Sequence, residues 1–173
     1  NIRLFNDLTV AENLMVAMGD SVRYGLVGRI LHFPRYAREE RIARERAEEL
    51  LSIFHMERHA DERAGSLPYG AQRRLEILRA LASNPCLLLL DEPAAGMNPS
   101  ETAELMENIR RIRDTFQIAV LLIEHDMNLV MNICEGICVL NFGHIIAKGT
   151  PEDIQRNQAV IEAYLGKKKE AAS

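Results

Sequence analysis

The chain begins with two stretches whose apolar residues recur at helical spacing, residues 9–18 and residues 35–54. Five apolar residues form the predicted buried side of the second stretch: Ala43, Ala47, Leu50, Leu51 and Phe54. The opposite side is densely charged, with residues of opposite sign four positions apart, an arrangement that stabilises an exposed helix. We interpret these charges as a solvated face rather than as a binding surface.

A third helix is predicted over residues 70–83, with one apolar side made of Leu75, Leu78, Leu81 and Ala82. It ends before Asn84 and Pro85, because proline cannot continue a helix.

The pattern then changes to continuous apolar runs of strand length. Residues 86–90 and residues 118–124 are typical of strands that are buried on both faces of a parallel sheet. Between them, Asn98 as N-cap, Pro99 at the first helical position and Glu101 predict a helix over residues 99–116. Its inner side is predicted to hold Leu105, Met106, Ile109, Ile112 and Phe116. A strand, a helix and a strand at this spacing predict a parallel crossover, so the fold class is α/β.

The last part of the chain predicts a β-hairpin followed by short helices. Strands over residues 136–140 and 144–147 flank a turn at residues 141–143, and helices follow over residues 151–155 and 159–165. We expect residues 167–173 to form a frayed tail.

Composition excludes several classes of protein. The 173 residues are 47% apolar with a formal net charge of −4, which does not fit a nucleic-acid binder. The longest apolar runs are far shorter than the roughly 20 residues of a membrane-spanning helix. Three widely spaced cysteines, Cys86, Cys134 and Cys138, indicate a reducing compartment without a disulfide framework. We expect Cys134 and Cys138 to be small buried core residues and propose no metal cage for them.

The strongest chemical signal is the apolar strand that ends in Asp91 and Glu92. Ligands of open α/β sheets bind at the carboxyl ends of the strands. There the first carboxylate could hold Mg²⁺ and the second could polarise an attacking water for phosphoryl transfer. The alternative is an acid pair that merely caps a helix.

Two further residues suit phosphate chemistry. Gly70 at a helix start would let backbone N–H groups approach an anion, and His125 at a strand end could donate a hydrogen bond to a phosphate. The alternatives are an ordinary helix-starting glycine and a structural histidine.

Four motifs in this order resemble the ATP-binding cassette (ABC) family. They are residues 67–74, the Asp91-Glu92-Pro93 strand end, the turn at residues 94–98, and Glu124-His125-Asp126. The resemblance implies the C-terminal part of a P-loop NTPase, a RecA-like parallel sheet with an ABC helical subdomain. It divides the chain into a helical subdomain (1–84), half of the RecA-like core (85–149) and C-terminal helices with a tail (150–173).

By this resemblance, Asp91 is the Mg²⁺-linked acid, Glu92 the catalytic carboxylate and His125 the switch histidine. Two segments would contact ATP that a second subunit holds. They comprise Ser66, Leu67, Pro68, Tyr69, Gly70, Ala71 and Gln72, and also Gly96, Met97 and Asn98. ATP and Mg²⁺ are therefore the implied cofactors, and a dimer of ATPase subunits is implied.

The sequence departs from the family pattern at several points. Pro68 and Ala71 stand where the family has serine and glutamine, and no G-x-x-x-x-G-K-[ST] loop occurs in these residues. Gly25 and Gly28 read as part of a surface turn at residues 23–34. We expect the chain to begin just past the family's Q-loop glutamine, and by itself neither to bind ATP tightly nor to hydrolyse it.

Within the family, the E-P-A-A-G-M-N-P and G-T-P-E stretches look most like the ATPase subunits of branched-chain amino acid importers. This implies ATP-driven import at the cytoplasmic face of the inner membrane, with a second ATPase subunit, identical or different, and transmembrane permease subunits as partners. Residues 1–13 belong to the expected docking surface for the permease. The alternatives are a motor for urea, amide or lipid transport, and a non-catalytic cassette that acts as a dimerisation module.

Overall fold

The computed structural model describes residues 3–19 and 34–165, with the backbone alone for residues 34–37, 164 and 165. Two compact units make up the chain, Asn1–Ile123 and Glu124–Ser173, and each has buried residues of its own. The expected tail at 167–173 and the turn at 23–34, apart from Pro34, lie outside the described residues. The three-part division of the chain stays a prediction.

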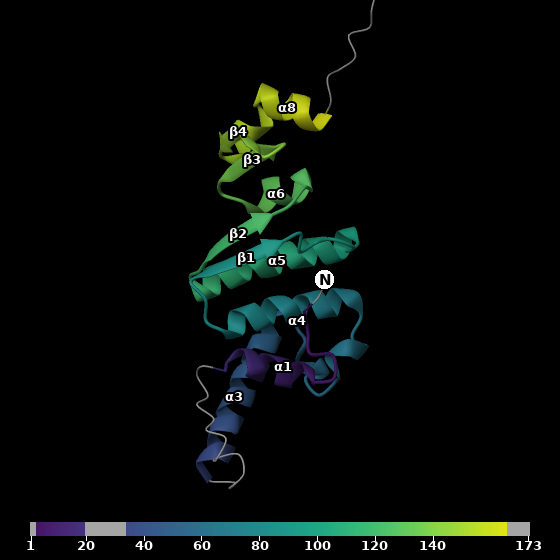
Figure 1. The fold of residues 1–173 in the computed structure, drawn as a ribbon, viewed down its shortest axis with the longest axis vertical. Helices are drawn as coiled ribbons and strands as arrows, with labels where there is room; N and C mark the ends of the chain where they lie inside the picture. Colours follow the sequence, from purple (N-terminus) through teal and green to yellow (C-terminus); the bar gives the residue numbers. More distant parts are fainter. Residues whose placement is uncertain (1–2, 20–33, 166–173) are drawn as a thin grey trace, which may run out of the picture. The chain divides into compact units, whose positions relative to one another are not determined.

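The first unit consists of helices followed by a helix packed beside two strands (Figure 1). Its elements are α1 (Val10–Ala17), α3 (Pro34–Ile53), the 3₁₀ turns η1 (Glu57–His59) and η2 (Ala64–Ser66), α4 (Tyr69–Ala82), β1 (Leu87–Asp91), α5 (Pro99–Phe116) and β2 (Ala119–Ile123). The four predicted helices and two predicted strands are confirmed, with shifted boundaries.

Local sequence signals explain how these helices begin. Thr9 caps α1 with a capping box in which its hydroxyl accepts from the N–H of Glu12. The buried amide of Asn13 then fixes the preceding segment, because its Nδ2 donates to the carbonyl oxygens of Phe5 and Thr9. Helix α1 therefore stabilises the conformation of the residues before it.

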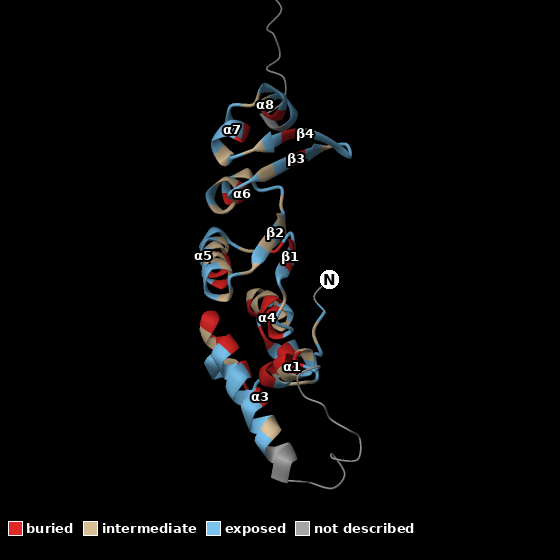
Figure 2. Ribbon diagram, turned by 90° about the vertical axis from the view of Figure 1, so that its left-hand side faces the viewer, coloured by how far each residue is buried: buried red, intermediate tan, exposed pale blue. Residues whose placement is uncertain are grey.

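The apolar faces of the helices meet in a core, and in both views α4 lies between α1 and the strand pair (Figures 1 and 2). All nine residues that the helical spacing assigned to buried faces of α3 and α4 are buried, including Phe54 (the residue after α3), Leu75 and Leu78. Burying a leucine or phenylalanine side chain stabilises a fold by about 1.5–3 kcal/mol. Burial of its apolar face in this core therefore fixes the position of α4.

Strands β1 and β2 pair in parallel, with Asp91 opposite Ile123, and α5 runs along one side of the pair (Figure 2). The predicted crossover is confirmed. The prediction that both strand faces are buried is wrong, because Leu88 and Leu90 are buried whereas Leu89 is 65% exposed. A strand is buried on both faces only when a layer covers each face. Among the described residues, only one face of β1 is covered.

The second unit is a hairpin covered by short helices. Its elements are α6 (Met127–Ile133), β3 (Ile137–Asn141), β4 (His144–Gly149), α7 (Pro151–Gln155) and α8 (Gln158–Leu165). The strands are antiparallel, and Val139, Ala147, Ile154 and Val160 form the core of this unit. The predicted hairpin and both final helices are confirmed. Helix α6 was missed, because seven residues are too few to establish a helical period.

The cysteines differ from expectation. Cys138 is exposed, because side chains alternate along β3 and its neighbour Val139 faces the core. Cys134 is only partly buried, and that burial raises the pKa of its thiol. The prediction of two buried core cysteines is therefore wrong for Cys138. None of the described helices combines the length and apolarity that are needed to cross a bilayer.

Candidate functional site

The carboxyl end of β1 presents two acidic residues. Asp91 is the last residue of the strand and Glu92 follows it, and both are exposed. The backbone N–H of Glu92 donates to the carbonyl oxygen of Ile123, with the nitrogen 2.9 Å from the oxygen. Glu92 adopts a left-handed conformation with φ of 44°, which costs a non-glycine residue about 1–2 kcal/mol. The pairing thus continues one residue past β1, and the chain then turns sharply at the second carboxylate.

A short turn joins Glu92 to α5. The N–H of Ala95 donates to the carbonyl of Glu92, and Gly96 takes a φ of 78° that suits glycine. The turn ends at Asn98, whose side-chain oxygen accepts from the N–H groups of Ser100 and Glu101. The predicted N-cap is therefore confirmed, and residues 94–98 are fixed at both ends.

Helix α4 begins at Tyr69 without a side-chain cap, because Pro68 occupies the N-cap position. The Ser66 hydroxyl donates to the Arg63 carbonyl at an Oγ–O distance of 2.7 Å, and Gln72 Nε2 donates to the Leu67 carbonyl at 2.9 Å.

Two residues of this segment, Leu67 and Ala71, are buried. The predicted signature residues 66–72 thus lie together around one helix start. Within that segment, the side chains of Leu67 and Ala71 are part of the hydrophobic core.

The start of α4 lies against the 94–98 turn and the start of α5. A Cβ atom on Gly70 would lie 3.2 Å from Oε1 of Glu101, and one on Gly96 would lie 3.5 Å from Cε1 of Tyr69. The structure therefore brings Tyr69 beside Gly96, and Gly70 beside Glu101. Sequence reasoning assigned Glu101 only a capping role, and no local signal links it to a residue 31 positions earlier.

One ion pair joins α4 to α5, and a second lies within α4. Arg74 Nη1 lies 2.9 Å from Oε1 of Glu104 on α5, and Arg73 Nη1 lies 2.9 Å from Oε2 of Glu76. Burial lowers the pKa of Arg73, but hydrogen bonds to Glu76 and Tyr69 outweigh it, so its pKa is raised. Arg73 therefore stays a cation one turn from the start of α4.

The other end of α4 binds the N-terminal segment. Glu76 Oε1 accepts from the N–H of Arg3, and Arg79 donates to the Arg3 carbonyl. The guanidinium of Arg79 also lies 4.9 Å from the ring centroid of Phe5, within cation–π range. Helix α4 thus contacts residues 3–5 near one end and the 94–98 turn at the other.

His125 belongs to the second unit and lies two residues after β2 in the chain. Its side chain is 74% exposed, and its Nδ1 lies 4.0 Å from Oε2 of Glu124. The next residue, Asp126, caps α6 by accepting from the N–H of Asn128. The histidine is thus held at the start of a capped helix.

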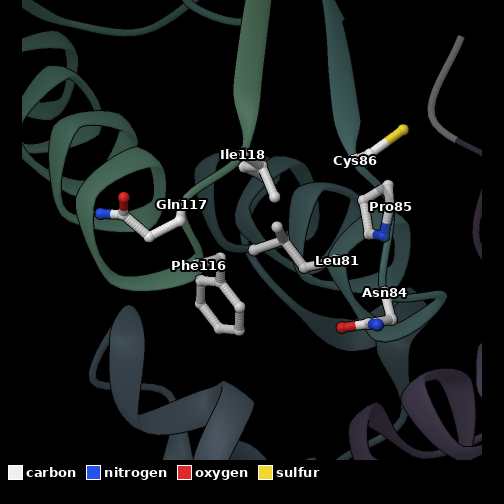
Figure 3. Close-up of a pocket in the computed structure, with 7 residues that line it drawn as sticks. All are labelled: Leu81, Asn84, Pro85, Cys86, Phe116, Gln117 and Ile118. Atoms are coloured by element: carbon white, nitrogen blue, oxygen red, sulfur yellow. The ribbon is translucent and has the colours of Figure 1, made fainter.

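A cavity of about 260 Å³ lies at the opposite, amino end of the two strands (Figure 3). Its lining includes Pro85 and Cys86 before β1, and Gln117 and Ile118 before β2. Ligands of open α/β sheets bind at the carboxyl ends of strands, so this cavity is not the candidate site. The candidate site is the carboxyl end of β1, at Asp91 and Glu92.

Comparison with known proteins identifies two matching family models. Residues 1–95 match the model of the family described as ABC transporter, and residues 144–170 match that described as branched-chain amino acid ATP-binding cassette transporter.

The chain is 47% identical over 166 residues to the high-affinity branched-chain amino acid transport ATP-binding protein LivG of Escherichia coli K12, which covers 96% of this chain and 65% of LivG. It is 36% identical to the lipopolysaccharide export system ATP-binding protein LptB of the same strain, over 94% of this chain and 61% of LptB. The chain thus spans less than two thirds of the length of either relative.

Solved structures give the same result. The ADP conformation of an ATP-binding cassette of an ABC transporter superposes with a TM-score of 0.73 at 27% identity, over 93% of this chain and 64% of that one. A dimeric post-hydrolysis cassette bound to ADP and Pi superposes with a TM-score of 0.68 at 25% identity, over 87% and 60%. The expected α/β cassette fold is confirmed. Since the family model described as ABC transporter covers more than half of the sequence and solved cassettes share its fold, the chain belongs to the ABC transporter family of ATP-binding cassettes.

Proposed function

We propose that the protein containing this chain is the ATP-hydrolysing subunit of an ABC importer for branched-chain amino acids. The observation that carries the ATPase proposal is the pair of exposed carboxylates at the carboxyl end of β1, directly before the 94–98 turn. The solute is taken from the likeness to LivG, whose name specifies branched-chain amino acid transport.

Asp91 and Glu92 divide the chemistry between them. Among the described residues, no cluster of three or more acidic, cysteine or histidine side chains could hold a metal by itself. One exposed carboxylate nevertheless suits Mg²⁺, which nucleotide sites hold through one or two carboxylates and the substrate phosphates. Asp91 would hold this ion, which supplies charge neutralisation on the phosphates. Glu92 accepts a proton from the attacking water and orients it.

The start of α4 and the 94–98 turn form the surface toward ATP bound by a second subunit. The backbone N–H of Gly70 and the positive end of the helix dipole attract a phosphate. Pro68 has neither a hydroxyl nor an N–H to donate, so this contact depends on the backbone around Gly70 and on Gly96 to Asn98. His125 donates a hydrogen bond to the terminal phosphate. A dimeric relative bound to ADP and Pi supports this arrangement.

Permease subunits at the cytoplasmic face of the inner membrane are the proposed partners. The docking surface includes the segment before α1, where Phe5 is 48% exposed although Asn13 and Arg79 hold that segment in place.

Replacing Glu92 with Gln in the protein that contains this chain tests the ATPase proposal. We expect ATP binding to persist and the steady-state ATPase rate to fall by about 10²- to 10⁴-fold, because the amide accepts no proton from water. Glu107→Gln, the same change on the exposed side of α5, should leave the rate unchanged. An undiminished rate in Glu92→Gln would refute catalysis and favour the dimerisation module.

The likeness to LptB supports a second candidate, a motor for lipid export. The two differ in the transported molecule and not in the ATPase site. Expression of the intact operon and measurement of radiolabelled leucine uptake separates them, because an export motor gives no ATP-dependent accumulation.

A further inference from the structure

The carboxylate of Glu101 lies unusually close to the backbone at the start of α4. A Cβ atom on Gly70 would be 3.2 Å from Oε1 and 3.7 Å from the carboxylate carbon of Glu101. Since 3.2 Å is tighter than ordinary van der Waals contact, only a residue without a side chain leaves the carboxylate undisturbed here. The negative charge therefore sits directly beside the second residue of α4.

A capping box at the start of α5 holds that carboxylate in place. Oε2 of Glu101 accepts from the N–H of Asn98 at 2.9 Å, and the N–H of Glu101 donates to Oδ1 of Asn98 at 3.0 Å. The capping box at the start of α5 fixes the Glu101 side chain through Oε2. The remaining oxygen, Oε1, faces Gly70. One carboxylate thus joins the 94–98 turn to the first turn of α4.

We infer that Glu101 is a positioning residue that weakens phosphate binding at the start of α4, so that the anion is released after hydrolysis. The inference rests on the proposed function of Gly70. The helix dipole and the backbone N–H of Gly70 attract a phosphate, and a fixed carboxylate within a few ångströms of the same backbone repels it. Because Glu101 is half-exposed, solvent reduces the repulsion, and the expected effect is about three- to tenfold in affinity.

Replacing Glu101 with Gln separates charge from structure. The amide oxygen can still accept from the N–H of Asn98, so the cap persists while the charge is lost. In the protein that contains this chain, we expect inorganic phosphate to bind about three- to tenfold more tightly by titration calorimetry. The KM for ATP and kcat should both fall, because slower release of phosphate slows each turnover. If Glu101 had only a structural role, its replacement would weaken phosphate binding.

Glu107→Gln is the matched control, because it removes the same charge farther along α5. Equal phosphate affinities in Glu101→Gln, Glu107→Gln and the unmodified protein would overturn the inference. Absence of ATPase activity in the unmodified protein would instead overturn the proposed function, and the phosphate titration would still decide the role of Glu101.

A second experiment tests the contact independently of nucleotide. Gly70→Ala should destabilise the protein in urea denaturation, because the added methyl group displaces the Glu101 carboxylate. In a Glu101→Ala background the same substitution should cost less, since the carboxylate is gone and alanine favours a helix over glycine. Additive effects of the two substitutions would show that the carboxylate does not lie against Gly70 in solution.

Discussion

Five non-glycine residues of the described chain have a left-handed backbone conformation, and Glu92 differs from the other four in its position. His55, Asn84 and Gln117 follow helix ends, where a positive φ commonly terminates a helix, and Phe142 lies in a hairpin turn. Glu92 alone among these five follows a strand of the parallel pair. Its conformation redirects the chain immediately after Asp91 and leaves both carboxylates at the edge of the sheet, as expected of strain that is retained for function.

A pH-dependent cap can be tested at the level of one residue, Asp153. Hydrogen bonds from the N–H and the hydroxyl of Thr150 hold the pKa of this carboxyl below its ordinary value. A lowered pKa in the folded state means that the cap stabilises α7 above the unfolded pKa, and that this contribution is lost as pH falls through the lowered value.

We expect Thr150→Val to raise the pKa of Asp153 toward its ordinary value, because one hydrogen bond to the carboxylate is removed. Thr150→Ser retains the hydroxyl and should keep the pKa low. An NMR titration of the Asp153 carboxyl carbon measures both, and a pKa that is equal in the two variants would contradict the assignment.

At the scale of elements, the helix starts and the hairpin turn differ in how well their sequences suit them. Helix α5 has the full set of N-terminal signals, with Asn98, Pro99 and Glu101 in their preferred positions. The β3–β4 turn has Phe142 and Gly143 at φ values of 46° and 79°, typical of a type I′ turn. Glycine suits such a turn and a bulky aromatic residue does not.

Phe142→Asn should therefore stabilise the protein by about 0.5–1 kcal/mol, because asparagine tolerates the left-handed conformation. Little burial is lost, since Phe142 is 96% exposed. Phe142→Ala is the control, since it removes the ring without relieving the turn and should change stability little. Urea denaturation of the three proteins measures the difference, and a loss of stability in Phe142→Asn would mean that the ring packs against another surface in solution.

At the scale of the whole molecule, the β1–β2 pair is asymmetric. One face is buried, whereas four apolar side chains on the strands are exposed: Leu87, Leu89, Leu121 and Ile123, at 46%, 65%, 55% and 58%. Parallel sheets are almost always covered on both faces. The stability of this chain should therefore depend on only one face of its parallel strands.

Leu88→Ala should cost about 3 kcal/mol, because it leaves a cavity at a position that is 2% exposed. Leu89→Ala should cost less than about 1 kcal/mol, as is usual for an exposed position. Urea denaturation of the 173-residue chain compares them. Equal costs would show that the second face is also covered in solution, for example by self-association.

The sequence by itself determined the elements whose causes are local. The helix start at Asn98, the stop before Pro85 and the hairpin turn were predicted because capping, proline chemistry and turn preferences act within a few residues. The two carboxylates at the end of β1 were found for the same reason, since an apolar run that ends in acids is a continuous pattern.

Only the tertiary structure determined which residues far apart in the sequence contact one another. The exposure of Leu89 depends on whether a second layer covers the sheet, and no local pattern contains that information. The contact of Glu101 with Gly70, and of Tyr69 with Gly96, joins residues about 30 positions apart through the packing of α4 against α5. Hydrophobic periodicity specifies which face of a helix is buried, but not which partner buries it.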